Sequence, residues 1–378
     1  MHVTLIVAHP PFREGTGTTC YYNALALRKL GCDVVVYAPR IRLSESEINI
    51  EFYRYMPTML AIGNAYFTPE ILRIRKTDLI HLHFPFILGS ELVLLKKVIS
   101  YVPFLVTYHN DLIGGGLRLP AFYIYNRLLV PIILSRANKI IVTSYDYAGS
   151  SIFNLSIFQK RRKDVVEIHN GVDVDFFRPG VDANFVRSRH NLQTQDTVLL
   201  FLSSLDRSHA RKGLGILLLA LSKLSNQKIK LLIVGDGDMR SEYVNKVKEL
   251  NLESKVVFTG RVPQNELPGY YAACDMVVIP SRPPEAFGLA LAQGMAAGKP
   301  VIGSNIPGVR CLIQEGKTGF MVEPDDILGL VDRIEELVLN QELRNAMGRR
   351  GRNFITQHYT WGRAGTDLLK LYKDILNS

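Results

Sequence analysis

The sequence predicts an α/β protein of two lobes, each a doubly wound parallel sheet covered by helices. Its 378 residues exceed the roughly 250–300 at which a single hydrophobic core stops growing. Short apolar runs alternate with helical patterns along the chain, which is the order expected of parallel strands joined by crossover helices. The runs are apolar at nearly every position, as is typical of strands buried on both faces.

The first lobe is expected to open with a strand at 3–7, a glycine-containing loop at 15–19, a helix at 20–30 and a strand at 33–37. Nucleotide-binding α/β folds begin in this order. The loop lacks the third glycine of a dehydrogenase fingerprint, and no acidic residue ends the second strand. We therefore expect the backbone at Gly15, Thr16 and Gly17 to approach a ligand closely, with a simple tight turn as the alternative.

Polar side chains follow the later strands of this lobe, which are expected at 79–83, 104–108, 139–143 and 165–168. Parallel sheets bind ligands at the carboxyl ends of their strands, so these residues are candidate binding groups. They are His83, His109, Asn110, Asp111, Ser144, His169 and Asn170.

The second lobe is expected to begin after an extended linker at 179–180, with strands at 197–202, 229–234, 256–258, 275–279 and 301–303. We place the first lobe at 1–178 and the second at 179–355. The remaining residues, 356–378, belong to an amphipathic helix predicted over 354–376.

Residues 280–303 carry the most informative pattern, a loop followed by a helix and a buried strand. The helix begins near Phe287, Gly288 and Leu289, and a helix start offers free N–H groups and a positive dipole end to phosphate. Glu285 lies in the loop, too far upstream to be needed as a first-turn cap, and a phosphate would repel it. We expect it to accept hydrogen bonds from hydroxyls, which suggests a nucleotide sugar. A surface glutamate before an ordinary packed helix is the alternative.

This stretch closely resembles the donor-binding signature of retaining glycosyltransferase family four. Glu285 matches the first of its two glutamates, and Gln293 stands at the second. The resemblance covers nearly the whole chain and implies the GT-B architecture, in which two Rossmann-like lobes face each other across a cleft. It also implies that Gln293 contacts the ribose, that His109 faces the donor sugar, and that the segment containing Asn170 closes the first lobe.

The resemblance further implies two cations on the donor diphosphate. Lys212 matches the family lysine, but Ser204 stands where the family carries arginine. Arg207, and second to it Arg211, are candidates for the missing charge because arginine binds phosphate through two parallel N–H groups. Exposed basic loop residues are the alternative. The family reads the base through backbone groups at the position of Arg261 and Val262.

Charge and composition limit the partners and the compartment. The chain has a formal charge of +10, and residues 1–178 hold 20 Lys and Arg against 14 Asp and Glu. A basic first lobe favours an anionic membrane or phosphorylated substrates, while no nucleic-acid motif is present. The segment 92–103 puts Lys96 and Lys97 beside apolar residues, as in an interfacial helix. A helix facing its own core, and a solvated basic surface, are the alternatives.

The four scattered cysteines argue against a zinc site or disulfides and fit a reducing cytosol. No signal peptide is expected, and the longest apolar stretch is too short and polar to cross a bilayer. We therefore expect a cytoplasmic protein, with the inner face of the cell membrane as a candidate location.

The resemblance implies a metal-independent and cofactor-independent retaining hexosyltransferase. A UDP-sugar is the favoured donor and GDP-mannose the next, and the acceptor is a glycan or a lipid-linked molecule. Because Gln293 and Ser204 depart from the family pattern, a nucleotide-sugar-binding subunit without turnover is one alternative, although Glu285, His109 and Lys212 argue against it. A phosphorylase or sugar epimerase of related architecture is another.

Overall fold

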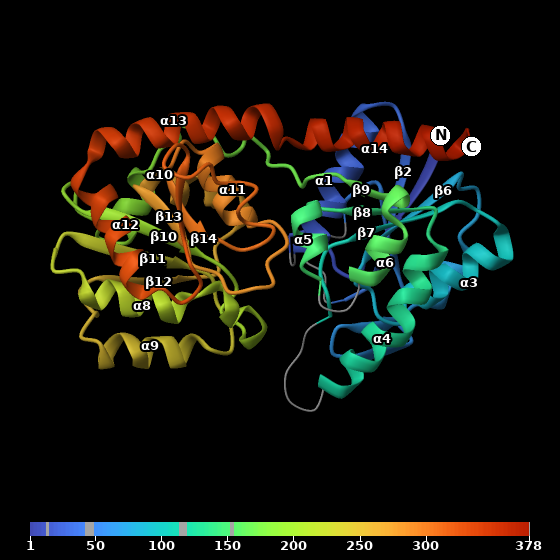
Figure 1. Cartoon of the computed structure of the whole chain (residues 1–378), viewed down its shortest axis with the longest axis horizontal. Helices are drawn as coiled ribbons and strands as arrows, with labels where there is room; N and C mark the ends of the chain where they lie inside the picture. Colours follow the sequence, from blue (N-terminus) through green and yellow to red (C-terminus); the bar gives the residue numbers. More distant parts are fainter. Residues whose placement is uncertain (13–14, 42–48, 113–118, 152–154, 378) are drawn as a thin grey trace. The chain divides into compact units, whose positions relative to one another are not determined.

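The computed structural model describes residues 1–12, 15–41, 49–112, 119–151 and 155–377. The chain forms two compact units (Figure 1). The first lobe comprises Met1–Gly171 with Trp361–Ser378, and the second comprises Val172–Thr360. The sequence placed the two changes of lobe at 178/179 and 355/356, a few residues away from these positions.

The first lobe contains a seven-stranded parallel sheet with the strand order β3-β2-β1-β6-β7-β8-β9. Its strands are β1 (His2–Ile6), β2 (Asp33–Pro39), β3 (Tyr53–Met56), β6 (Leu79–Phe84), β7 (Phe104–Tyr108), β8 (Lys139–Val142) and β9 (Val165–Glu167). A separate antiparallel hairpin joins β4 (Leu60–Ile62) to β5 (Ala65–Phe67). Every residue of β6 and β7 is buried, as expected for central strands covered on both faces.

Helices cover both faces of this sheet (Figure 1). They are α1 (Gly15–Lys29), α3 (Ser90–Ser100), α4 (Leu119–Arg136), α5 (Tyr145–Gly149), α6 (Leu155–Lys160) and α14 (Trp361–Leu376), with 3-10 turns η1 (Pro69–Arg73) and η3 (Arg162–Asp164). One apolar cluster joins the sheet to α1 and α14, and a second joins it to α3 and α4. Alternate residues of β1 belong to different clusters, Leu5 to the first and Ile6 to the second, because strand side chains alternate between faces.

The loop predicted over residues 15–19 is wrong, because α1 already begins at Gly15. Glycine and threonine are weak helix formers, which is why the sequence pattern indicated a loop there. A side chain on Gly17 would lie 2.2 Å from the carbonyl oxygen of Pro10. Only glycine allows this approach, so tertiary packing outweighs local helix propensity at the start of α1.

The second lobe contains a six-stranded parallel sheet with the strand order β12-β11-β10-β13-β14-β15. Its strands are β10 (Thr197–Leu202), β11 (Ile229–Val234), β12 (Val256–Gly260), β13 (Met276–Ile279), β14 (Val301–Ser304) and β15 (Gly319–Val322). Its helices are α7 (Asn184–Arg189), α8 (Leu214–Lys223), α9 (Arg240–Glu249), α10 (Leu267–Ala273), α11 (Leu289–Ala296), α12 (Ile327–Leu339) and α13 (Gln341–His358), with 3-10 turns η4 (Arg207–Lys212) and η5 (Gln264–Glu266). A single apolar core surrounds the sheet.

The single helix predicted at the end of the chain is two helices. Helix α13 ends at His358 and α14 begins at Trp361. Between them, the carbonyl oxygen of Tyr359 accepts a 2.8 Å hydrogen bond from Val172 N–H. Trp361 then stacks on Tyr22 of α1 at a ring distance of 5.0 Å, so α14 packs on the first lobe. In the part of the chain that the structure describes, no helix has the length and apolar character needed to cross a membrane.

Candidate functional site

Two loops of the second lobe meet at the carboxyl edge of its sheet, where the strand order changes direction. Strands β10 and β13 are neighbours in the sheet, but the chain visits β11 and β12 between them. In open parallel sheets, the crevice at such a switch point is the usual place for a ligand. The loop after β10 contains Lys212, and the loop after β13 contains Glu285, so the topology brings both predicted residues to this crevice.

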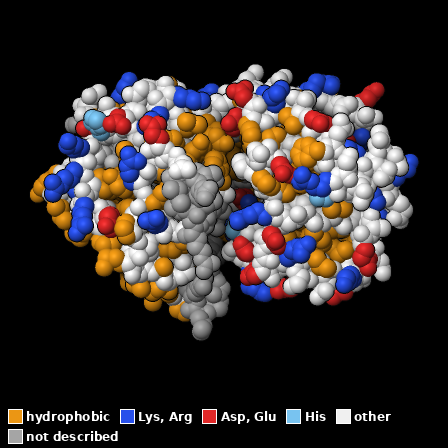
Figure 2. Space-filling model, turned by 180° about the vertical axis from the view of Figure 1, so that it is seen from behind, with side chains coloured by type: hydrophobic (Ala, Val, Ile, Leu, Met, Phe, Trp, Pro, Cys, Tyr) orange, Lys and Arg blue, Asp and Glu red, His pale blue; other side chains and the backbone are white. Residues whose placement is uncertain are grey.

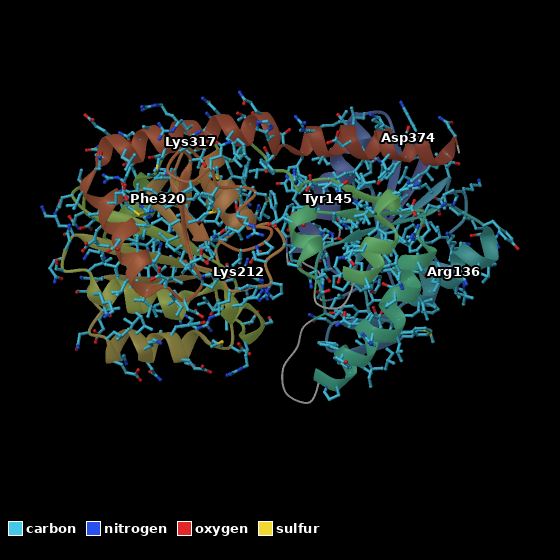
Figure 3. The ribbon with its side chains drawn as sticks, in the orientation of Figure 1. Arg136, Tyr145, Lys212, Lys317, Phe320 and Asp374 are labelled. Carbon is cyan, nitrogen blue, oxygen red and sulfur yellow. The ribbon has the colours of Figure 1, made fainter. Side chains whose placement is uncertain are left out.

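Lys212 and Glu285 form an ion pair across the two loops. The amino nitrogen of Lys212, labelled in Figure 3, lies 2.5 Å from Oε2 of Glu285. Both side chains are largely buried, with exposed fractions of 18% and 10%. The backbone N–H of Gly288 also donates to the Glu285 carboxylate. The loop therefore curls back so that Glu285 contacts Gly288, the residue that precedes α11.

The Glu285 carboxylate is ionised at neutral pH despite its burial. Burial alone would raise its pKa, but the charges of Lys212 and Arg211, with hydrogen bonds from Lys212 and Gly288, outweigh that effect. The net result is a pKa below the usual value of 4.5. The site therefore already holds one anion against a lysine and a helix start, the same groups that bind phosphate in many proteins.

Close backbone packing fixes the two loops against their surroundings. Gly213 has a φ of +84°, and a side chain there would lie 2.0 Å from the carbonyl oxygen of Pro280. Gly308 has the same φ, and a side chain there would lie 2.1 Å from the carbonyl oxygen of Glu285. Neither glycine can be replaced without moving backbone, so the positions of Lys212 and Glu285 are set by rigid contacts.

The structure brings Arg211, and not Arg207, to Glu285. The side chain of Arg207 is 72% exposed, and its guanidinium pairs with Glu242 of α9 at 2.7 Å. Arg211 turns the other way, and its Nε donates to the carbonyl oxygen of Pro284 at 2.9 Å. The first choice for the second cation, Arg207, is thus directed away from the pair. Sequence could not distinguish the two arginines, because both lie on the short turn η4.

His209 is a residue of this site that the sequence did not single out. It is half-buried on η4 beside Arg211 and Lys212. Burial, followed by the charges of those two residues, lowers its pKa. Its position three residues before Lys212, on the same turn, is the signal that could have identified it.

Gln293, predicted to contact a ribose, lies on α11 with its side chain buried. Its Oε1 accepts a 2.8 Å hydrogen bond from the hydroxyl of Tyr271, a fully buried residue of α10. Tyr271 is also 3.1 Å from the carbonyl oxygen of Ala290. The amide is therefore held in one orientation by a neighbouring helix.

The other residues predicted to bind the donor lie at the start of α11 and after β12. Phe287 is buried, with its ring 5.8 Å from that of Tyr359, so only its backbone is available to a ligand. Gly288, with a φ of +80°, directly precedes α11, and Leu289 begins it. Arg261 and Val262 follow β12, which is two strands from β10 along the same sheet edge.

In the first lobe, His109 belongs to a buried column of three histidine rings. Its Nε2 lies 2.9 Å from Nδ1 of His83. The ring of His83 in turn lies 4.7 Å from that of His81. Burial lowers the pKa of His109 to about 4, so its ring is neutral at pH 7. Of the predicted cleft residues, Gly15, Thr16 and Gly17 form the first turn of α1, and Asn170 follows β9 half-buried.

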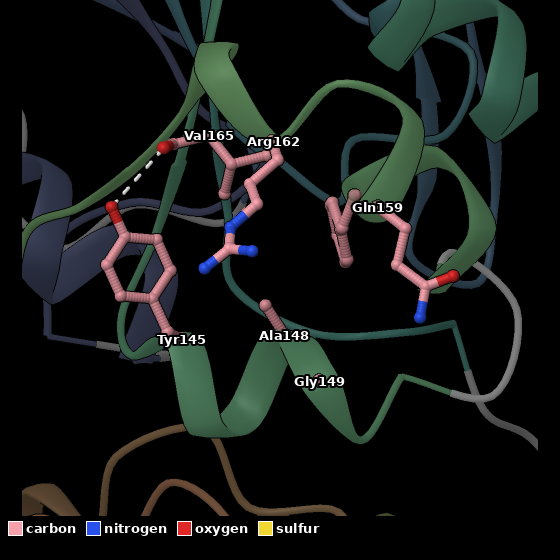
Figure 4. A pocket seen from close by; sticks show the side chains of 7 residues that line it. Tyr145, Ala148, Gly149, Gln159, Arg162 and Val165 are labelled. Carbon is pink, nitrogen blue, oxygen red and sulfur yellow. Dashed lines mark hydrogen bonds between the residues drawn. The ribbon is translucent and has the colours of Figure 1, made fainter.

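Two cavities of the first lobe contain none of the predicted site residues. One of about 600 Å³ is lined by residues of α5, α6 and η3 and by the start of β9, with Arg162 and Tyr145 on one side (Figure 4). The other, of about 800 Å³, lies between the end of the sheet and α14. Among the described residues, no three His, Cys, Asp or Glu side chains are grouped so that they would hold a metal ion.

Comparison with known proteins gives consistent matches over most of the chain. Residues 182–354 match the family described as glycosyl transferases group 1, and residues 13–176 match glycosyltransferase family 4. The N-acetyl-alpha-D-glucosaminyl L-malate synthase of Bacillus anthracis is 24% identical over 89% of this chain and 85% of its own length. A GDP-mannose-dependent alpha-(1-6)-phosphatidylinositol monomannoside mannosyltransferase of Mycobacterium tuberculosis is 32% identical over 50% of this chain and 51% of its own.

Among solved structures, Anabaena HepE in complex with UDP and glucose has a similar fold. It matches with a TM-score of 0.81 and 18% identity, over 99% of this chain and 100% of its own. At this identity the likeness concerns the fold alone.

Proposed function

This chain belongs to glycosyltransferase family 4 and has the GT-B fold, and from this premise we propose that it moves a hexosyl unit from a nucleotide sugar, with retention at the anomeric carbon. The acceptor is a glycan or a lipid-linked molecule. The observation that carries the proposal is the Lys212–Glu285 pair at the switch point of the second lobe. That pair joins a phosphate-binding cation to a carboxylate able to bind sugar hydroxyls.

In this proposal the donor diphosphate competes with Glu285 for Lys212. The two groups are 2.5 Å apart, so a diphosphate at the start of α11 would take over the lysine and the N–H groups of Phe287, Gly288 and Leu289. Glu285 is then free to accept hydrogen bonds from the sugar. Arg211 supplies the second cation, because its guanidinium is already held beside Glu285 by the carbonyl oxygen of Pro284.

The reaction needs stabilisation of the leaving group more than it needs a base. The bond from the anomeric carbon to the diphosphate oxygen breaks, the acceptor oxygen bonds to the same face of that carbon, and the leaving diphosphate takes the acceptor proton. Lys212, Arg211 and the dipole of α11 stabilise the charge that develops on the diphosphate. Neither a metal nor a cofactor is required. His109, neutral at pH 7, is suited to hydrogen bonding with the sugar, while Gly15, Thr16, Gly17 and Asn170 stay candidates for the acceptor side.

The nucleotide is assigned to α11 and to the end of β12. Gln293, oriented by Tyr271, offers its amide to the ribose hydroxyls, and the backbone at Arg261 and Val262 reads the base. A UDP-sugar is our first choice, in keeping with the UDP bound to HepE. GDP-mannose is the second, in keeping with the mannosyltransferase relative.

The proposal is tested by screening UDP-, GDP- and ADP-sugars in EDTA, with thermal shift for binding and product release for turnover. We expect one nucleotide class to raise the melting temperature and its sugar to be slowly hydrolysed without metal. No binding by any donor would exclude the assigned site. Binding without turnover, even with added acceptors, would favour the non-catalytic alternative, and a requirement for inorganic phosphate would favour a phosphorylase.

A further inference from the structure

Two neighbouring helices of the first lobe expose rows of large apolar side chains, which we call the α3/α4 face. Helices α3 and α4 contact each other, and Lys97 of α3 donates to the carbonyl oxygen of Arg136 at the end of α4. The face consists of Leu95, Val98 and Ile99 on α3, exposed by 45–61%, and Ile124, Leu128 and Ile132 on α4, exposed by 49–58%. The spacing within each row is that of one helix side.

Packing against the lobe's own sheet does not account for these rows. The inner sides of the same helices are filled by other apolar residues, such as Val93 of α3 and Ile133 of α4, which are at most 1% exposed. The helices are thus apolar on two sides, whereas an ordinary surface helix has a polar outer face. Exposed apolar groups gathered in this way mark an interaction surface. Figure 2 shows hydrophobic side chains along the left and lower-left rim, where α3 and α4 lie.

The charged side chains that accompany the α3/α4 face are basic. Helix α4 contains Arg127 and Arg136 and no acidic residue, and Arg136 is labelled in Figure 3. The acid of α3, Glu91, has both carboxylate oxygens buried. Lys96 was predicted to lie on the basic side of an interfacial helix, and this prediction is wrong. Its side chain is buried and donates to the carbonyl oxygen of Leu72 at 3.2 Å.

We propose that the α3/α4 face docks the protein on an anionic lipid surface. Apolar side chains flanked by arginines are the combination that enters the interface of such a membrane. A second copy of this chain fits less well, because a symmetric contact would bring each face onto itself and set Arg127 against the same basic surface. The proposal goes beyond the transferase activity and does not depend on the donor site.

The experiment is co-sedimentation of the full chain with phosphatidylcholine vesicles containing increasing phosphatidylglycerol, at low and high salt. We expect binding that rises with anionic lipid and weakens in salt. The variant Leu128→Glu/Ile132→Glu should lower the partition coefficient by at least about tenfold, since two apolar anchors are replaced by anions. Arg127→Glu should weaken binding at low salt more than at high salt.

The matched control is Leu328→Glu/Leu339→Glu, which changes two exposed side chains of α12 in the second lobe, 65% and 83% exposed. It should bind vesicles like the wild type, and equal loss in both double variants would overturn the proposal. Absence of wild-type binding at low salt would also overturn it. If sedimentation instead reveals a dimer that Leu128→Glu/Ile132→Glu dissociates, with no vesicle binding, the face belongs to a second copy. Donor binding, measured by thermal shift, should be unchanged in both double variants, which separates this result from the donor-site proposal.

Discussion

The two lobes are both parallel sheets covered by helices, but the titratable side chains buried after their strands differ in charge. In both, polar side chains follow the carboxyl ends of parallel strands. In the second lobe, burial of Glu285 is offset by Lys212 and Arg211, so the carboxylate stays charged. In the first lobe, His83 and His109 are buried beside each other, and burial makes both rings neutral by lowering their pKa values.

A buried histidine with a lowered pKa also lies at the switch point of the first lobe. The strand order reverses between β1 and β6, and the loop after β1 contains His9. Burial lowers the pKa of His9 to about 4. Among the described residues, corresponding fold positions thus hold a charged carboxylate in the second lobe and a neutral imidazole ring in the first, and the neighbouring side chains decide which. A charged crevice suits a diphosphate, whereas neutral rings suit hydroxyl groups.

The largest expected effect comes from removing the charge at the centre of the second-lobe site. Glu285→Gln should lower kcat by about 100-fold or more, in the range for loss of a transition-state contact. Affinity for the nucleoside diphosphate should not fall, because Lys212, 2.5 Å away, loses a competing anion. Steady-state kinetics and calorimetry measure the two quantities. Equal losses in turnover and nucleotide affinity would place Glu285 on the diphosphate and contradict its assigned contact with the sugar.

A smaller effect distinguishes the two arginines of η4. Arg211→Ala should weaken nucleoside diphosphate binding by roughly 1.5–3 kcal/mol, the range for hydrogen bonds to charged groups. Arg207→Ala is the matched control, since its partner is the exposed Glu242; its effect should stay below about 1 kcal/mol. Calorimetric titration of both variants gives the comparison. A larger loss in Arg207→Ala would return the second cation to the position first chosen from the sequence.

Most strands could be predicted from the sequence because their apolar runs are sharply bounded. The predicted strands at 197–202 and 229–234 coincide with β10 and β11. The ends of helices were predicted less accurately than the strands. The start of α1 depends on the contact between Gly17 and Pro10, and the gap after α13 coincides with the hydrogen bond from Val172 to Tyr359. Both are contacts with residues outside the helix itself, which the helix propensity of single residues does not take into account.

The sequence could predict residues of the candidate site but not the contacts between them. The loop-and-helix pattern pointed to Glu285 and the family resemblance to Lys212, but their ion pair depends on the neighbouring positions of β10 and β13. Similarly, the amphipathic pattern around Lys96 did not reveal which side chains face outward, since long basic side chains can reach inward to a backbone carbonyl. Side-chain direction is set by tertiary contacts, so the sequence pattern did not show that Lys96 points inward.

The smallest expected effect tests the neutral histidines of the first lobe through the pH dependence of stability. His109 has a pKa of about 4 when folded and 6.5 as its ordinary value, so below pH 6.5 the unfolded chain binds a proton that the folded chain does not. Stability should therefore fall as the pH drops from 6.5 towards 4, and His109 alone contributes about 1 kcal/mol between pH 7.5 and 5.5. The pKa of Glu285 lies below 4.5, so the second-lobe pair loses its stabilising effect only in more acidic solution.

Urea unfolding at pH 7.5 and 5.5 should give a smaller difference in stability for His109→Asn than for the wild type. His190→Asn is the graded control, because burial also lowers the pKa of that ring but His190 is only partly buried. An unchanged pH dependence in His109→Asn would mean that the ring takes up a proton as readily in the folded lobe as in the unfolded chain, and the contrast between the two lobes would be lost.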